Sequence, residues 1–201
     1  MTLLELTSAF GAIAAEGILS EPYAIDKITD FEGRVLEERK PRETEAVPPD
    51  LNYLITNLLK AVVNEGTGRG ARALGRPLAG KTGTSQDQRD MWFMGFTPDL
   101  VCSAWMGYDD FSPLGKKMAS GSVLVPWWTQ FMKEALKGVP PRDFAVPEGI
   151  TFVKIDADTG YRALPDCPRI ILEAFKAGTE PKDFCPVDHY QYGGAEPQAE
   201  D

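Results

Sequence analysis

Six consecutive residues, Gly80-Lys-Thr-Gly-Thr-Ser85, place one lysine and three hydroxyl groups after the apolar Pro77-Leu-Ala79. A lysine ammonium and neighbouring hydroxyls bind carboxylates through charge-assisted hydrogen bonds. Glycine has no Cβ, so a second backbone can lie flat against such a stretch. The pattern therefore predicts a strand that receives a ligand carrying a carboxylate.

The same residues also fit the pattern of a phosphate-binding loop, which would begin at Gly75 and end at Lys81 and Thr82. That kind of site needs a buried strand before the loop and a helix that starts at its lysine. The segment before the loop, residues 66–72, is polar and rich in glycine, and Gly83 follows Thr82. Because glycine disfavours a helix start, we expect no nucleotide site here.

The residues after this stretch predict the element that positions it. Two aromatic segments, residues 91–96 and 100–108, flank a Thr-Pro-Asp turn at residues 97–99. Such a pattern is typical of two antiparallel strands joined by a tight connection. The lysine of the central stretch is therefore expected on a strand beside a hairpin.

Three segments have apolar residues at helical spacing, and we expect them to be helices: residues 3–16, 50–65 and 123–136. Gly17 ends the first, and Asp50 is a candidate N-cap for the second. The third is entered through Pro126, and its large apolar side chains are Trp127, Trp128, Phe131 and Leu136. Packing of this third helix on an aromatic sheet explains its tryptophans better than binding of a sugar or a lipid.

Shorter patterns predict two further hairpins. One joins residues 23–28 to residues 34–37, and a charged surface connection follows at residues 40–49. The other joins residues 151–155 to the residues from Tyr161 onwards. The turn between these, residues 156–160, has the form Asp-x-Asp-x-Gly but lacks the further acidic ligands of a calcium loop. We therefore interpret it as a turn.

Composition limits the classes of protein and partner. The chain has 201 residues, of which 43% are hydrophobic and 25% charged, which suits one globular domain with an appendage. Its formal net charge of -9 repels phosphate backbones, so we expect no nucleic-acid partner. The longest uncharged stretch, residues 118–132, is too short to cross a bilayer. The first residues do not resemble a signal peptide, so an export signal is expected outside this chain.

The three cysteines differ in their surroundings. Cys102 falls within an aromatic strand and is expected to be a small core residue. Cys167 and Cys185 each precede a proline in a segment with few apolar residues, and we predict that they form a disulfide worth roughly 3 kcal/mol. That bond would indicate an oxidising compartment. These two cysteines and His189 are too few for a zinc site, so we expect no metal, and His189 is expected to be solvated.

Six phrases occur in order along the chain: Leu3-Leu-Glu-Leu-Thr-Ser-Ala-Phe10, Asn64-Glu-Gly-Thr-Gly-Arg69, Ala79-Gly-Lys-Thr-Gly-Thr-Ser85, Asp90-Met-Trp-Phe-Met-Gly-Phe-Thr-Pro98, Trp105-Met-Gly-Tyr-Asp-Asp110 and Asp158-Thr-Gly160. In these phrases, from Leu3 to about Gly160, the chain resembles the C-terminal part of the transpeptidase domain of class A, bifunctional penicillin-binding proteins. Lys-Thr-Gly alone is a weak signal, but six phrases in the family's order are specific.

This resemblance implies an α+β fold of the β-lactamase and transpeptidase type, in which an antiparallel sheet packs against helices. It implies that Lys81 and Thr84 are catalytic, through the proton network and an oxyanion-hole N–H respectively. It also implies that the hydroxyls of Thr82 and Thr84 bind the substrate carboxylate and that Gly83 permits close approach. No cofactor is implied. The implied ligands are peptidoglycan stem peptides and β-lactams, at the periplasmic face of a bacterial inner membrane.

The chain departs from the family pattern in one respect that matters for activity. None of its seven serines is followed three residues later by lysine, and no Ser-x-Asn is present. The nucleophile motif, the second motif and the glycosyltransferase half of the family are therefore missing. We expect a fragment of a cell-wall transpeptidase, inactive alone, whose sheet lacks its N-terminal strands and its nucleophile helix, and whose partner is that N-terminal half.

Two other kinds of protein stay open at this point. One is a non-catalytic module that keeps the Lys-Thr-Gly wall to bind a peptide or a partner. The other is a fragment of a D,D-carboxypeptidase or a β-lactamase, which would not be expected to carry the two aromatic phrases. We place the transpeptidase part at residues 1–138, an extension with the hairpin and disulfide at 139–192, and a disordered tail at 193–201.

Overall fold

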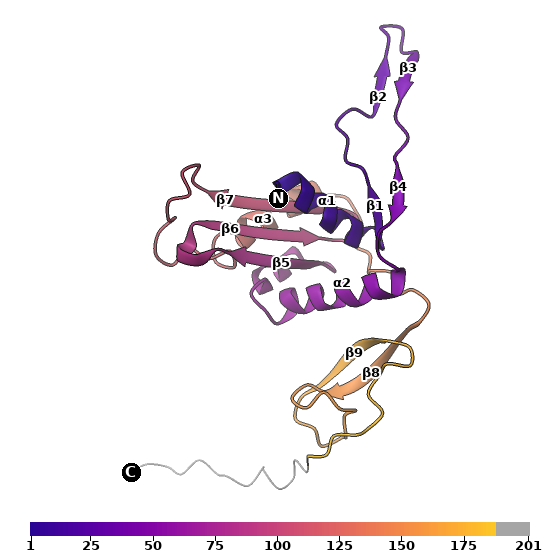
Figure 1. Ribbon diagram of the computed structural model, residues 1–201, viewed down its shortest axis with the longest axis vertical. Coiled ribbons are helices and arrows are strands. Elements are labelled where there is room, and N and C mark those ends of the chain that lie inside the picture. Colours follow the sequence, from indigo (N-terminus) through magenta and orange to yellow (C-terminus); the bar gives the residue numbers. More distant parts are fainter. Residues whose placement is uncertain (188–201) are drawn as a thin grey trace. The chain divides into compact units, whose positions relative to one another are not determined.

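The computed structural model describes residues 1–187, and the chain divides into two units (Figure 1). The first unit is Met1–Val146, and the second begins at Pro147. The sequence places this change a few residues earlier, between residues 138 and 139. The tail predicted at residues 193–201 lies outside the described residues.

A three-stranded antiparallel sheet organises the first unit. Its strands are β5 (Ala79–Thr84), β6 (Asp90–Phe96) and β7 (Val101–Gly107), in the order β5-β6-β7. A short 3-10 turn, η2 (Gln86–Gln88), joins the first two strands. The turn between β6 and β7 is held by the Thr97 hydroxyl, which accepts backbone N–H groups of the next residues at 3.2 Å. The predicted strand beside a hairpin is confirmed.

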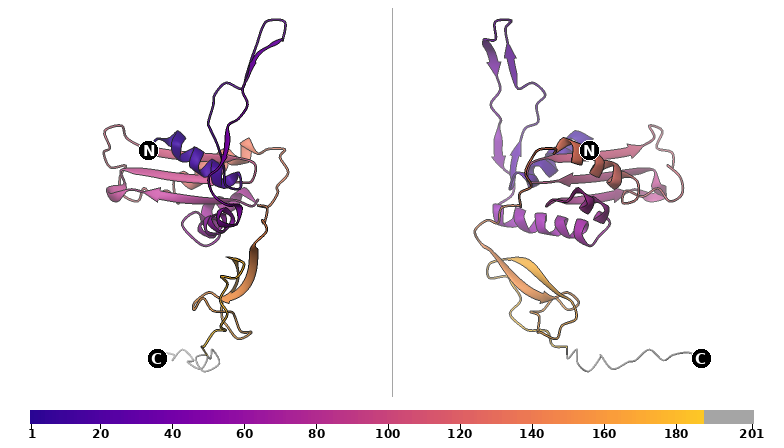
Figure 2. Two further views of the ribbon diagram at one scale, coloured as in Figure 1. Left: turned by 45° about the vertical axis from the view of Figure 1, so that its right-hand side comes forward. Right: turned by 180° about the vertical axis from the view of Figure 1, so that it is seen from behind.

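Helices cover both faces of this sheet, and the two directions of view in Figure 2 show α1 (Leu3–Ala14) and α3 (Leu124–Ala135) on opposite sides. On the α3 side, Phe93 and Trp128 meet edge to face with ring centroids 4.9 Å apart. On the α1 side, Phe10 and Phe96 meet at 6.3 Å. Because side chains alternate along a strand, β6 supplies aromatic contacts to both helices.

The second helix, α2 (Pro49–Asn64), packs along β5 and leads into the 3-10 helix η1 (Arg69–Leu74). Asp50 was expected to be the N-cap of this helix, but the N-cap is Pro48, two residues earlier, so that prediction is wrong. Proline is favoured at the first helical position, where its missing N–H costs nothing, and Asp50 then lies in the first turn.

Helix α3 shows which of its aromatic residues pack on the sheet. Trp128 and Leu136 are buried, as expected. Trp127 and Phe131 are 58% and 48% exposed and stack on each other at 6.1 Å, so the expectation that they pack on the sheet is wrong. Positions four apart share one face of a helix, and this pair lies on the face turned away from β6 and β7.

Two small antiparallel pairs lie between α1 and α2. The hairpin of β2 (Lys27–Thr29) and β3 (Val35–Glu38) was expected from the sequence. The other pair, β1 (Ile18–Ser20) with β4 (Glu43–Glu45), corrects the prediction that residues 40–49 are only a surface connection. These two strands are three residues long and largely exposed, so they have no alternation of apolar residues from which a strand could be predicted.

The second unit contains one hairpin, in which β8 (Ile150–Asp156) pairs with β9 (Ile170–Lys176). The prediction that β8 pairs with the residues from Tyr161 onwards is confirmed only locally: Ile155 and Arg162 form an antiparallel bridge, and the N–H groups of Asp156 and Ala163 donate to the Tyr161 and Lys154 carbonyls at 2.9 Å. The main partner of β8 is β9, which the sequence did not predict. Within residues 1–187, no helix has both the length and the apolar character needed to cross a bilayer.

Candidate active-site cleft

A cleft of about 700 Å³ opens beside β5, on the sheet face that α3 covers. Three segments form its walls: the α2–η1 connection, the last residues of β5, and the loop before α3. Its lining is largely small and hydroxyl-bearing, and comprises Glu65, Gly66, Thr67, Arg69, Gly70, Thr82, Thr84, Ala119, Ser120, Gly121 and Ser122.

The two threonines of the Lys-Thr-Gly-Thr stretch face this cleft together. They are two residues apart on β5, so both project from the same face, beside Phe93 and Met91 of β6. The Thr82 hydroxyl lies 2.5 Å from that of Thr67. The structure thus brings together the two hydroxyls that the sequence assigns to a carboxylate.

Ser120 holds the hydroxyl of Thr84 in place. The Ser120 side chain is 1% exposed and donates to the Gly83 carbonyl. Its oxygen also lies 3.0 Å from the Thr84 hydroxyl. Since the Ser120 proton goes to the carbonyl, Thr84 is the donor in this second bond. The Thr84 proton therefore points to the Ser120 hydroxyl oxygen.

Lys81 lies on the opposite face of β5 from the two threonines. Its side chain is exposed, and Nζ donates to the Thr82 carbonyl at 2.8 Å. The structure therefore brings the lysine to the same strand as the hydroxyls but not into the cleft lining. A substrate role for Lys81 would require its ammonium to reach past the strand edge.

The glycines of β5 are explained in part by packing within the sheet. A Cβ at Gly80 would lie 2.7 Å from the Met94 carbonyl oxygen, which a real Cβ does not tolerate. One at Gly83 would lie 3.2 Å from Cβ of Trp92. Close approach of β6 thus favours glycine at both positions, independently of any ligand.

Sequence reasoning missed Thr67 and Ser120 as members of this site. Thr67 falls in a segment that reads only as a flexible loop, and it reaches the cleft because α2 packs along β5. Ser120 falls in an uncharged run beside a glycine and a second serine. A cluster of small residues next to a helix was the only local sign of a site there. The partners of Ser120 on β5, Gly83 and Thr84, can be identified only from the fold.

Asp90 is the first residue of β6 and comes shortly after the Lys-Thr-Gly-Thr stretch in sequence. Its carboxylate links β6 to β7. Its carboxylate accepts the indole N–H groups of Trp92 at 2.9 Å and Trp105 at 3.2 Å. Partial burial disfavours the charge, but the hydrogen bonds with Ser85 and both tryptophans outweigh it, so the pKa of Asp90 lies below its usual value.

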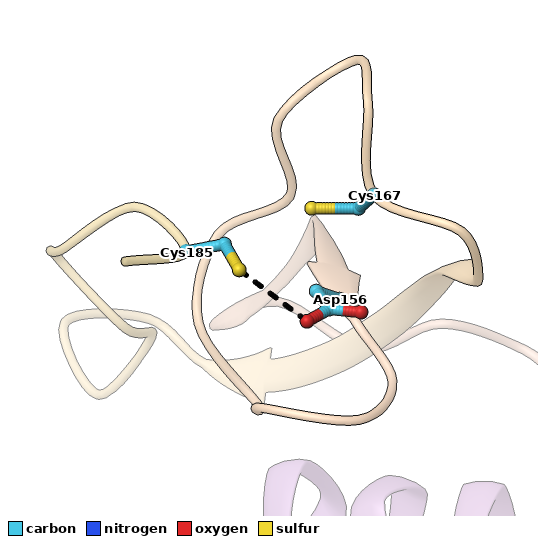
Figure 3. A group of neighbouring side chains, drawn as sticks. All are labelled: Asp156, Cys167 and Cys185. Carbon is cyan, nitrogen blue, oxygen red and sulfur yellow. Dashed lines mark hydrogen bonds between the residues drawn. The ribbon is translucent and has the colours of Figure 1, made fainter. Parts of the chain in front are cut away.

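The cysteines predicted to pair lie together in the second unit. Cys167 and Cys185 are both buried thiols, and Figure 3 shows their sulfur atoms beside the Asp156 carboxylate. The ligand atoms of the three residues lie within 4.8 Å of one another. The disulfide stays a prediction. Cys102, in β7, is half-buried and packs against the core beneath α3.

A Lys-Thr-Gly strand whose hydroxyls line a cleft, beside an aromatic hairpin covered by helices, defines the class of penicillin-recognising proteins. Comparison with known families agrees. Residues 1–111 match the penicillin binding protein transpeptidase domain, and residues 146–190 match the penicillin-binding protein 1A C-terminal domain. The chain belongs to the penicillin-binding protein transpeptidase family, as part of a class A transpeptidase domain.

Individual relatives support this assignment. Penicillin-binding protein 1A of Aquifex aeolicus is 39% identical over 92% of this chain and 25% of its own length. The crystal structure of penicillin-binding protein 1A from Haemophilus influenzae superposes with a TM-score of 0.82 at 28% identity, over 92% of this chain and 33% of that one. Penicillin binding protein 3 of Mycobacterium tuberculosis, solved with ampicillin, gives 0.54 at 25% identity, over 73% and 37%. The chain spans about a quarter of the length of the curated relatives it matches.

Proposed function

We propose that this chain forms the carboxylate-binding wall of a D,D-transpeptidase active site, which crosslinks peptidoglycan stem peptides and is acylated by β-lactams. The observation that carries the proposal is the pair of hydroxyls, Thr82 and Thr84, on the cleft face of β5. Two donors at this spacing suit the terminal carboxylate of a D-alanyl-D-alanine peptide or of a penicillin. The relative solved with ampicillin supports a β-lactam as a ligand of this family.

In this proposal each residue of the stretch has its own role. The Thr84 hydroxyl leaves Ser120 and donates to the carboxylate, while Ser120 stays fixed by the Gly83 carbonyl. Thr82, supported by Thr67, supplies the second hydroxyl. The Thr84 N–H serves as an oxyanion-hole donor, a contribution worth about 2.7–4 kcal/mol where it has been measured. The Lys81 ammonium, which lies on the other face of β5, reaches past the strand edge to supply positive potential and to take part in proton transfer.

The attacking group of this reaction is not in the sequence. The family's serine stands in a Ser-x-x-Lys motif, and none of the seven serines here has lysine at that spacing. A cleft wall without a nucleophile can bind a substrate but cannot form a covalent acyl-enzyme with it. The chain therefore acts together with the N-terminal half of the domain, which supplies the serine and the second motif. Activity of this kind belongs on the extracytoplasmic side of the inner membrane.

A second candidate is a non-catalytic peptide-binding module. It is favoured by one observation: both cleft threonines of β5 have their hydroxyl partners within this chain, Thr67 for Thr82 and Ser120 for Thr84. Such a module would bind a peptide carboxylate reversibly and would need no serine nucleophile.

Labelling with a fluorescent penicillin tests the catalytic part of the proposal. The purified chain should form no adduct that survives denaturation, since it lacks the nucleophile, while an intact relative such as the Aquifex aeolicus protein should be labelled as a control. A stoichiometric covalent label on any serine of this chain would contradict the proposal and would identify a different catalytic serine by peptide mapping.

A further inference from the structure

Three potential metal ligands meet in the second unit, although the sequence predicts no metal there. Asp156 is 0% exposed, Cys167 7% and Cys185 4%. They come from the end of β8, from the loop that follows it, and from the segment after β9. Figure 3 shows both sulfur atoms and the carboxylate turned toward one shared space. Charged or ionisable groups are rarely buried together unless they pair or bind a metal.

We propose that Asp156, Cys167 and Cys185 bind a zinc ion. Zinc takes thiolate sulfur at about 2.3 Å and carboxylate oxygen at about 2.0 Å in tetrahedral geometry, so these two ligands stand about 3.5 Å apart on one ion. Cys185 Sγ and Asp156 Oδ2 are 3.4 Å apart. All three ligand atoms lie within 4.8 Å, so closing the site around an ion needs a movement of about 1 Å.

The groups around the ligands suit a zinc–thiolate site. The Leu164 N–H donates to Cys167 Sγ at 3.2 Å. The Thr159 hydroxyl donates to Asp156 Oδ2 at 2.6 Å and lies 3.6 Å from Cys185 Sγ. Donors of this kind orient metal ligands and stabilise the negative charge of sulfur. The turn at residues 156–160, dismissed above as a calcium loop, thus supplies both a ligand and its support.

The chemistry of the ligands selects the metal. Two thiolates favour zinc over calcium or magnesium, which take only oxygen ligands. Each cysteine releases its thiol proton when it binds, so two protons leave for each ion bound. Three protein ligands leave the fourth tetrahedral position for water or another ligand.

The predicted disulfide uses the same two sulfur atoms and is the competing state. Its formation would bring the sulfurs to about 2.05 Å. It would also remove the S–H donor that Cys185 offers to the buried Asp156 carboxylate. A disulfide is neutral, whereas zinc brings positive charge to the buried carboxylate. Only the zinc site uses all three buried groups.

Metal analysis of the intact chain tests the proposal. The chain purified without chelators should carry about one zinc ion, and Asp156→Asn and Cys167→Ser should each weaken binding by more than about tenfold. Cys102→Ser is the matched control, because Cys102 lies in β7 of the first unit. The Cys102→Ser variant should bind zinc with the affinity of the unaltered chain. Zinc retained by both variants at the affinity of the unaltered chain would overturn the proposal.

A second measurement avoids the risk that a variant fails to fold. In the unaltered, reduced chain, zinc should slow alkylation of Cys167 and Cys185, and a chelator should restore it, while alkylation of Cys102 should not change. Peptide mapping by mass spectrometry reads each cysteine separately. Equal alkylation with and without zinc would overturn the proposal. So would a zinc-free chain, made in zinc-containing medium, in which Cys167 and Cys185 are joined.

Discussion

Asp90 joins two strands of the sheet through one carboxylate. It accepts both indole N–H groups of Trp92 and Trp105, whose rings lie 6.2 Å apart, and its own N–H donates to the Ser85 hydroxyl at 2.9 Å. These hydrogen bonds of Asp90 anchor Ser85, the residue just after the Lys-Thr-Gly-Thr stretch. The lowered pKa of Asp90 means that its charged form is the one the fold favours.

Asp90→Asn should make stability less dependent on pH. A carboxyl group whose pKa is lowered by folding stabilises the protein above its unfolded pKa of about 4, and that stabilisation is lost as pH falls through the folded value. The variant should unfold more easily at pH 7, by about 1 kcal/mol, because a charge-assisted bond becomes a neutral one. Thermal melts from pH 7 to 3 should show this difference shrinking in acid. A difference that stays constant over the whole range would contradict the role given to the charge.

At the scale of elements, one glycine allows α3 to pack on the sheet. A Cβ at Gly95 of β6 would lie 2.4 Å from Cζ2 of Trp128 and 2.9 Å from Cε1 of Phe93. Both rings are buried, so neither can move without disturbing the core. Gly95 therefore fixes how closely α3 approaches the strands.

Gly95→Ala should destabilise the first unit by about 1–3 kcal/mol or more, because the core is overpacked. Gly11→Ala is the matched control: Gly11 lies within α1, and an added Cβ there would meet nothing within 4 Å. That change should raise stability by about 0.5–1 kcal/mol through helix propensity. Urea unfolding followed by tryptophan fluorescence measures both. Equal effects of the two substitutions would refute the packing argument.

The elements that the sequence predicted correctly are those with a strong periodic pattern. The three helices carry apolar residues at helical spacing, and β6 and β7 are aromatic, apolar runs on either side of a turn, so tertiary packing agrees with the local pattern. The strands β4 and β9 were missed or misplaced. β4 is polar and three residues long, and β9 lies beyond a loop whose proline-bearing sequence also suits a tight turn.

The candidate site was predictable only where it is contiguous in sequence. Thr82 and Thr84 lie in one strand, so their shared face follows from alternation. Thr67 and Ser120 join them through helix packing and a loop, which no local pattern encodes. Asp156 is the sharpest case, because its role as a ligand depends on two cysteines that are 11 and 29 residues away in the sequence. Only the folded loop brings these groups together.

At the scale of the whole molecule, β7 forms an edge of the sheet that could pair with a strand of another chain. Among the described residues, β7 pairs only with β6. Its other edge has no strand partner along Val101–Gly107, a segment without charged residues, and Trp105 is 39% exposed. Such an edge is a template for pairing with another chain.

The chain should therefore self-associate or bind hydrophobic dyes, and should become monomeric when the N-terminal half of the domain is co-expressed. Sedimentation velocity over a range of concentrations measures the first effect. A monomer with a sharp melt at all concentrations would contradict the open edge and would favour the self-sufficient binding module.

The measurement that tests the central claim most directly is acylation of a chimera. In it, this chain replaces the corresponding quarter of the Aquifex aeolicus penicillin-binding protein 1A, which supplies the rest of the domain. We predict that the chimera reacts covalently with a fluorescent penicillin, and that Thr84→Val slows the reaction by about 10–150-fold, the loss of one hydrogen bond to a charged group. Thr44→Val, on the exposed strand β4, should leave the rate unchanged. A folded chimera that Thr84→Val leaves equally reactive would contradict the assignment of β5 as the carboxylate-binding wall.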